Sequence, residues 1–202
     1  MSNEDTFKQE LRGHLQEARD VLVWKLDGLT EAEIRRPLTP TGTNLLGLVK
    51  HLAGVELLYL GFVFGRHYQE PVPWFRPDLG PDAFAPDTDK WATAEESREF
   101  VTGVYRDAWR HADATLAALP LDTVGFVPWW PREYGPATLH RVAVHLIAET
   151  SRHAGHADIV RELIDGSAGY QQDRRQLPSE EPGWWQAHRA KLAAEAAAAA
   201  GG

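Results

Sequence analysis

Residues 45–64 read LLGLVKHLAGVELLYLGFVF, and this stretch decides the fold. Its apolar residues recur every three or four positions, the spacing of one buried helix face: Leu45, Leu48, Val49, Leu52, Val55, Leu58, Tyr59 and Phe62. Thr43 or Asn44 is expected to cap the helix start. The longest apolar run, 52–64, contains Glu56 and is too short to span a bilayer. We therefore expect a core helix and no membrane partner.

Three further segments have helical spacing, over about residues 5–27, 93–119 and 137–166. Thr30 with Glu33 and Thr93 with Glu96 match the capping-box pattern, and the second pair predicts that a helix begins near Thr93. A proline-rich connection over residues 65–91 is long enough to let the second and third helices run parallel. No strand pair is evident. The predicted fold class is all-α, a four-helix bundle with a long crossover.

The length, charge and composition of the chain exclude several kinds of site and partner. The chain has 202 residues, which favours one domain over residues 1–169 and a polar extension over 170–202 that ends in an Ala/Gly tail. Its formal net charge is −8 and it has no cysteine, which excludes disulfides, cysteine-based metal sites and a cysteine nucleophile. An acidic chain without a basic run is not expected to bind nucleic acid. The polar N-terminus is unlike a signal peptide, so we expect a cytoplasmic protein.

The last predicted helix carries the candidate chemistry. His145, Glu149, His153 and His156 share an arc of about 80° on successive turns, since helix residues advance by about 100° each. Glu149 and His153 can converge on one divalent cation, and His51 from the facing helix would supply a third ligand. Three protein ligands leave an open position, as in catalytic sites.

Other residues near this arc receive supporting roles. His145 and His156 are candidates for residues behind the ligands or in the pocket wall, and Arg152 for pairing with a substrate carboxylate. A second interpretation stays open from the residues alone. An inward histidine is often a hydrogen-bonded core residue, and a glutamate four positions before a histidine is a common surface pair.

Three stretches resemble the DinB-like superfamily, which includes the mycothiol-dependent maleylpyruvate isomerases and an actinobacterial branch. These stretches are residues 42–53 with Glu56, the Pro128-Trp129 segment, and residues 149–158, which read ETSRHAGHAD. The resemblance covers about residues 5–168. It implies an up-down-down-up bundle, a divalent metal (zinc first, nickel second) and a homodimer. The family's ligand triad maps onto His51, Glu149 and His153, with glutamate as in the isomerase branch where many members have histidine.

The resemblance also implies an activity. Family members hold a low-molecular-weight thiol such as mycothiol at the open metal position, where a coordinating thiol is deprotonated. The expected function is thiol S-transfer to a small-molecule electrophile, or thiol-assisted isomerisation. Two alternatives remain. One is a hydrolase that uses metal-bound water with His145, His156 or Glu56 as general base, and the other is a non-catalytic metal-binding or interaction protein.

Aromatic residues in the two long loops are the remaining candidates for function. Those in question are Trp74, Phe75, Trp129, Trp130 and Tyr134. They either cover one end of the bundle as part of a substrate site or only close its core. Both interpretations fit the sequence.

Overall fold

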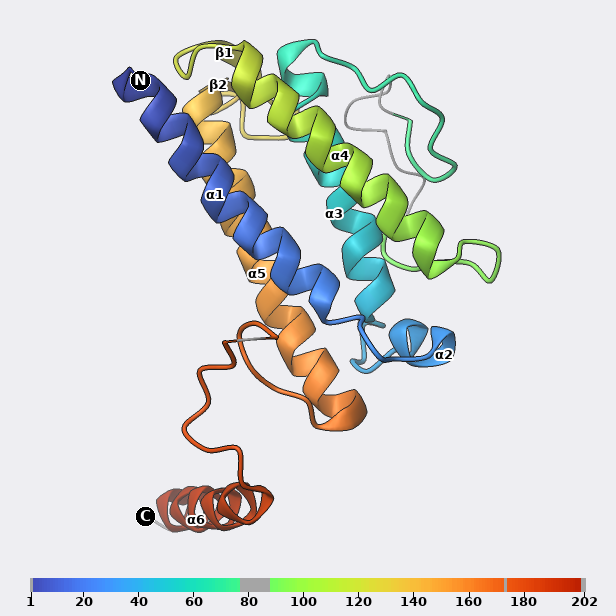
Figure 1. Cartoon of the computed structure of the whole chain (residues 1–202), viewed down its shortest axis with the longest axis vertical. Helices are drawn as coiled ribbons and strands as arrows, with labels where there is room; N and C mark the ends of the chain where they lie inside the picture. The colour runs from blue at the N-terminus through green and yellow to red at the C-terminus, as the bar shows by residue number, and fades with distance from the viewer. Residues whose placement is uncertain (1, 77–87, 173, 201–202) are drawn as a thin grey trace. The chain divides into compact units, whose positions relative to one another are not determined.

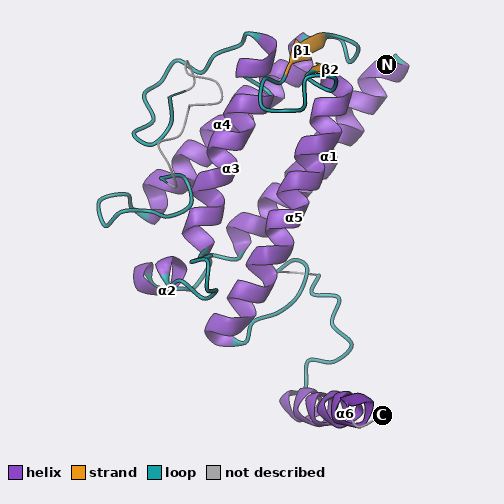
Figure 2. Ribbon diagram, turned by 180° about the vertical axis from the view of Figure 1, so that it is seen from behind, coloured by secondary structure: helices purple, strands orange, loops and turns teal. Residues whose placement is uncertain are grey.

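The long helices begin at side-chain caps that the sequence supplies. In the computed structural model, which describes residues 2–76, 88–172 and 174–200, helix α1 (Asn3–Trp24) begins after Ser2 and α3 (Leu45–Tyr59) begins after Asn44. Helix α4 (Arg98–Ala118) is capped by Ser97, and α5 (Leu139–Asp165) by Thr138. A short α2 (Glu31–Arg35) begins at the predicted Thr30–Glu33 capping box. The chain is mostly helical, as expected for an all-α protein (Figure 1, Figure 2).

Two predicted helix boundaries were wrong. The helix over 45–64 ends at Tyr59, and a separate 3-10 turn, η1 (Phe62–Phe64), follows it. The helix expected from Thr93 begins at Arg98. Glu96 still accepts a hydrogen bond from the Thr93 backbone N–H at 2.8 Å, and its carboxylate also binds Lys50. The residue that caps α4 is Ser97, so the Thr93–Glu96 turn precedes the helix. Part of the predicted crossover, residues 77–87, lies outside the described residues.

The expectation of no strand pair was also wrong. Strands β1 (Val124–Phe126) and β2 (Pro136–Thr138) form an antiparallel hairpin, with Gly125 opposite Ala137. Three residues per strand are too few to show a period-two pattern in the sequence. The hairpin closes the loop over 127–135, which carries both Trp129 and Trp130, and the Val127 N–H donates to the Gly135 carbonyl at 2.8 Å.

Helix α3 lies against its neighbours on several sides and is almost wholly buried. It packs against α4 and α5, while α1 packs against α5 and α4 (Figure 1). The His51 ring lies beside His153 and the Tyr59 ring beside His145, so α3 and α5 run antiparallel. Helices α3 and α4 run in the same direction, because Lys50 contacts Glu96 and Arg66 contacts Thr115. Helix α3 thus packs on both α4 and α5, while α5 and α4 also pack on α1.

The stretch Leu45–Phe64 is long and apolar enough to cross a membrane, but 89% of its most apolar window is buried inside the protein. That burial is typical of the core helix of a soluble protein. Core side chains on α3 include Leu45, Leu46, Leu52 and Leu57, each at most 1% exposed. Apolar burial of this kind is the main stabilising contribution to folding.

The core also contains a buried ion pair. The guanidinium of Arg19 on α1 donates to both carboxylate oxygens of Glu56 on α3, at 2.9 and 2.5 Å, and both side chains are fully buried. Arg19 also donates to Asp113 on α4 at 2.9 Å. Burial opposes the charged form of Arg19, but attraction to these two carboxylates outweighs it and raises the arginine pKa. Burial raises the pKa of Glu56, and Arg19 opposes that shift.

The chain separates into two compact units, Met1–Ser167 and Ala168–Gly202. The first ends just after α5, where Gly166 takes a left-handed conformation (φ 76°) and stops the helix, as predicted. The second contains α6 (Pro182–Ala200), in which the Trp184 ring stacks on His188 with ring centroids 4.7 Å apart.

Replacing Arg19 with Met leaves Glu56 buried without its cation. We expect Arg19→Met to lower the free energy of unfolding by about 3–5 kcal/mol, measured by urea titration. The double variant Arg19→Met/Glu56→Leu should recover most of this loss, since it removes both charges. Arg110→Ala removes an exposed pair with Asp107 and should change stability by less than about 1 kcal/mol. A loss for Arg19→Met no larger than that of Arg110→Ala would contradict this assignment.

Candidate functional site

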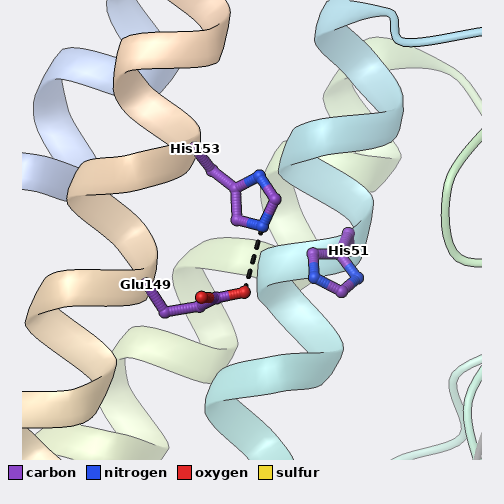
Figure 3. A group of neighbouring side chains, drawn as sticks. All are labelled: His51, Glu149 and His153. Carbon is purple, nitrogen blue, oxygen red and sulfur yellow. Dashed lines mark hydrogen bonds and ion pairs between the residues drawn. The ribbon is translucent and has the colours of Figure 1, made fainter.

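His51, Glu149 and His153 lie together between α3 and α5. Each offers one ligand atom, and these atoms lie within 4.8 Å of one another (Figure 3). Glu149 and His153 are four residues apart on α5, so one helix face presents both. His51 faces them from α3, with its ring centroid 5.0 Å from that of His153 and the two planes at 71°. The three residues singled out in the sequence are therefore neighbours in the structure.

The α5 residues already contact one another. His153 Nε2 lies 3.1 Å from Glu149 Oε1, and His153 Nδ1 lies 3.3 Å from His156 Nδ1. Both nitrogens of His153 thus have polar neighbours. Burial lowers the pKa of His153, and the nearby His51 lowers it further, while Glu149 acts in the opposite direction. The neutral ring, which is the form that coordinates metals, is therefore favoured.

His51 is oriented by a carboxylate that sequence reasoning missed. His51 Nδ1 donates to Asp89 Oδ2 at 2.6 Å. Because a carboxylate only accepts, Nδ1 carries a proton, and in the neutral ring this leaves the electron pair on Nε2. Burial raises the pKa of Asp89, but hydrogen bonding and attraction to His51 outweigh it and give a lowered pKa. Metal-binding histidines commonly have such a carboxylate behind them.

A second buried pair holds the segment that carries Asp89. Lys50 Nζ donates to both oxygens of Glu96, at 2.9 and 2.7 Å, and to the Trp91 carbonyl at 2.9 Å. The Lys50 ammonium also lies 4.7 Å from the Trp74 ring centroid. At Gly47 the segment comes so close that a Cβ atom would lie 1.9 Å from the Lys90 carbonyl oxygen. Glycine at position 47 is thus what lets residues 88–91 lie on α3 beside His51.

This group of donors fits a divalent cation. Two imidazoles and one carboxylate are ligands that zinc accepts, at about 2.0–2.2 Å from the ion. Ligand atoms of a tetrahedral ion at that distance stand roughly 3.3–3.6 Å apart, so the 4.8 Å spread closes with small side-chain adjustments. The carboxylate behind His51 further supports the fit.

A cavity of about 720 Å³ opens beside the two histidines. Its wall includes His51, His153 and His156, together with residues 41–44 at the start of α3 and the pair Lys90 and Trp91. Trp91 is half exposed. A cavity next to candidate metal ligands is where a small molecule would reach them.

The other residues predicted for the site do not all lie beside the candidate metal ligands. His156 lines the cavity, as just described. His145 lies one turn before Glu149 and packs on Tyr59, with ring centroids 4.8 Å apart, and it borders another groove. Arg152 is exposed and belongs to neither cavity wall. Glu56 is bound to Arg19 through both oxygens, so the expectation that it could act as a general base was wrong.

The aromatic residues of the loops have three different environments. Trp74 and Phe75 are buried in the core. Trp129 and Trp130 donate their indole N–H groups to the Tyr59 hydroxyl, at 2.8 and 3.0 Å. Tyr134 is 52% exposed. Asp89 has no local pattern that predicts its role, because its contact with His51 depends on the path of a long loop.

Fold and site together define a class: a mostly helical protein in which two histidines and a glutamate converge beside a cavity. The model of the mycothiol S-transferase family matches residues 10–166, and the chain belongs to this family, which is DinB-like. The resemblance found in the sequence motifs is thereby confirmed.

One solved structure shows the fold as well. A conserved protein from Enterococcus faecalis superposes with a TM-score of 0.52 at 16% identity, over 83% of this chain and 99% of that chain. At this identity the likeness concerns the fold alone. No curated relative matches the sequence.

Replacing Lys50 with Met leaves Glu96 without its buried cation and removes a donor to the Trp91 carbonyl. We expect faster hydrogen exchange at the amides of residues 88–97 than in the unmodified protein, with α1 unchanged, as read by mass spectrometry. Lys8→Met, which removes a surface pair with Glu4, is the matched control. Unchanged exchange over 88–97 in Lys50→Met would mean that this pair does not hold the segment.

Proposed function

We propose that the protein is a divalent-metal-dependent S-transferase that joins a mycothiol-type thiol to a small-molecule electrophile. The convergence of His51, Glu149 and His153 beside the cavity carries this proposal. Membership of the mycothiol S-transferase family supports it, since that family name describes thiol transfer. The chain has no cysteine, so the sulfur has to come from an external thiol.

His51, Glu149 and His153 would hold the ion, with zinc as the first candidate and nickel as the second. A bound divalent cation supplies Lewis acidity, which lowers the pKa of a coordinating thiol and gives a thiolate at neutral pH. In the transfer itself, a bond forms between the thiol sulfur and the electrophilic carbon. The leaving group departs with its electron pair, and the thiol proton passes to solvent.

The protein's own residues prepare this site. Asp89 keeps the proton of His51 on Nδ1 and fixes the ring plane. His156 contacts His153 Nδ1 and so restrains the second ring. His156, Lys90 and Trp91 form part of the cavity wall, where they would contact the thiol. The burial of Glu56 against Arg19 removes one general base from the alternative of a hydrolase, which keeps only His145 and His156.

The same proposal includes the wider organisation of the chain. We infer an up-down-down-up bundle of α1, α3, α4 and α5, supported by the pairwise packing and directions of these helices. Residues 1–169 would form this bundle domain and 170–202 the extension. We also propose a cytoplasmic homodimer, on the basis of the resemblance described from the sequence. Thiol-assisted isomerisation would use the same site and thiol, with no group leaving.

Removing one proposed ligand tests the metal site. His51→Ala should bind zinc at least roughly 100-fold more weakly than the unmodified protein. Loss of a residue that only hydrogen-bonds to a metal ligand already lowers metal affinity by about 10- to 100-fold, and His51 would be a ligand itself. Metal content after purification, read by plasma mass spectrometry, and competition with a chelator measure this. His14→Ala, an exposed histidine on α1, is the control. Full metal content in His51→Ala would rule out the triad as assigned.

Thiol dependence tests the reaction. The zinc-loaded protein with mycothiol should turn over monochlorobimane, as followed by fluorescence, and activity should fall to background when either the metal or the thiol is omitted. His51→Ala should lose this activity and His14→Ala should keep it. Activity on ester or amide substrates without any thiol would favour the hydrolase. Metal binding without turnover in either assay would favour the non-catalytic alternative.

A further inference from the structure

A second groove lies beside α5 and has a wall of fixed aromatic rings. Its volume is about 420 Å³, and it is lined by Trp130, Pro131, Tyr134, Arg141, Val144 and His145. The buried Tyr59 hydroxyl accepts from the indole N–H of Trp130 at 3.0 Å, which fixes that ring. The His145 ring packs edge-on against Trp130, with centroids 4.9 Å apart at 79°. The groove therefore offers a flat aromatic surface, and the contacts of Trp130 with Tyr59 and His145 fix its orientation.

One cation lies over this surface. The Arg141 guanidinium carbon is 5.0 Å from the Trp130 ring centroid and 5.5 Å from that of Tyr134. Among residues 2–76, 88–172 and 174–200, no carboxylate forms an ion pair with Arg141. Arg141 belongs to the first turn of α5, which has no acidic residue. The positive end of the helix dipole adds to the guanidinium charge there. These charges favour an anion over the aromatic wall.

The groove adjoins the candidate metal site along α5. His145 lies one turn before Glu149, on the same arc of the helix. Glu149 is close enough to oppose the lowering of the His145 pKa that burial and Arg141 cause, and its charge also contributes to the raised pKa of Tyr59. The 720 Å³ cavity lies on the other side of His153, toward His156. Along α5, the groove thus has its residues before Glu149 and the cavity has its residues after Glu149.

We propose that the groove is the subsite for the electrophile and takes a planar, conjugated molecule that carries a carboxylate. The planar part takes the place of the Arg141 guanidinium over the Trp130 ring, since aromatic faces attract one another in offset geometry, and the guanidinium moves to the edge of the ring. Arg141 binds the carboxylate through its planar donors, which suit carboxylates better than a lysine ammonium does. The proposal rests on the proposed function for the chemical step, but binding in the groove does not depend on it.

Binding is tested without the reaction. The probes are 3,5-dinitrobenzoate and its neutral counterpart 1,3-dinitrobenzene, titrated with the metal-loaded full chain and followed by ligand NMR. Arg141→Met should weaken binding of the benzoate about tenfold or more and change binding of the neutral probe less than twofold, because a charge-assisted hydrogen bond is lost. Arg141→Lys should retain an intermediate affinity. Val144→Trp, which fills the groove from an exposed position, should weaken both probes.

Matched controls make the outcome decisive. Arg106→Met removes an exposed arginine of α4 and should leave both affinities unchanged. Equal affinity for the benzoate in Arg141→Met and the unmodified protein would overturn the proposal. So would a tenfold loss in Arg152→Met with none in Arg141→Met, because the carboxylate would then lie elsewhere on α5.

Turnover measurements distinguish a failure of the electrophile subsite from a failure of the proposed thiol transfer. With mycothiol, 4-chloro-3,5-dinitrobenzoate and 1-chloro-2,4-dinitrobenzene each form a carbon–sulfur bond and release chloride. Arg141→Met should raise KM about tenfold for the benzoate only. If the unmodified protein turns over neither these probes nor monochlorobimane, the proposed function fails, and the titrations alone decide whether the groove binds the carboxylate. If both probes are turned over and Arg141→Met has the same KM for each as the unmodified protein, the transferase function is supported. The proposal that the groove binds the electrophile is then wrong.

Discussion

Helix α3 is apolar enough to fill the core and still carries a lysine, a histidine and a glutamate. The structure depends on the partners that neutralise these three side chains. Lys50 pairs with Glu96, His51 with Asp89 and Glu56 with Arg19. An unpaired charge at such positions would cost several kcal/mol, by the usual order of magnitude for buried ions. Each pair therefore ties another element to α3: α1 through Arg19, and the segment over 88–97 through Asp89 and Glu96.

The candidate site follows from this arrangement. The segment over 88–97 is held at two places on α3, and Gly47 leaves room for its backbone. It brings a carboxylate to His51 and places Lys90 and Trp91 in the cavity wall. Helix α5 contributes its residues more simply, since Glu149 and His153 share one face of a regular helix. The geometry of the site thus combines one local pattern with one tertiary constraint.

Local patterns made much of the fold predictable. Helix α5 spans Leu139–Asp165, close to the expected range of 137–166, and the arc of His145, Glu149 and His153 followed from helix geometry. The position of Asp89 was not predictable, because a residue in a long loop has no periodicity that fixes its partner. Glu96 was read as part of a helix cap because its spacing from Thr93 fits one. Its main partner, Lys50, lies 46 positions away in sequence, which no local pattern reveals.

The hairpin was missed for a related reason, since β1 and β2 pair over only three residues each. Their pairing places Trp129 and Trp130 on Tyr59, the last residue of α3, and so forms an aromatic cluster at that end of the α3–α5 contact. His145 shares the α5 arc with the candidate ligands, but its ring contacts Tyr59 and Trp130 instead of His51. Helix arithmetic shows which residues share a face, and only packing shows which neighbour each one meets.

X-ray absorption spectroscopy of the zinc-loaded protein, with and without mycothiol, shows directly whether two histidines and a glutamate hold the ion and leave a position for the thiol. We expect nitrogen and oxygen neighbours at about 2.0–2.2 Å from two imidazoles and one carboxylate, and one added sulfur neighbour at about 2.3 Å when the thiol is present. A spectrum without a sulfur neighbour at saturating thiol, or one with four protein ligands that the thiol does not change, would contradict this expectation.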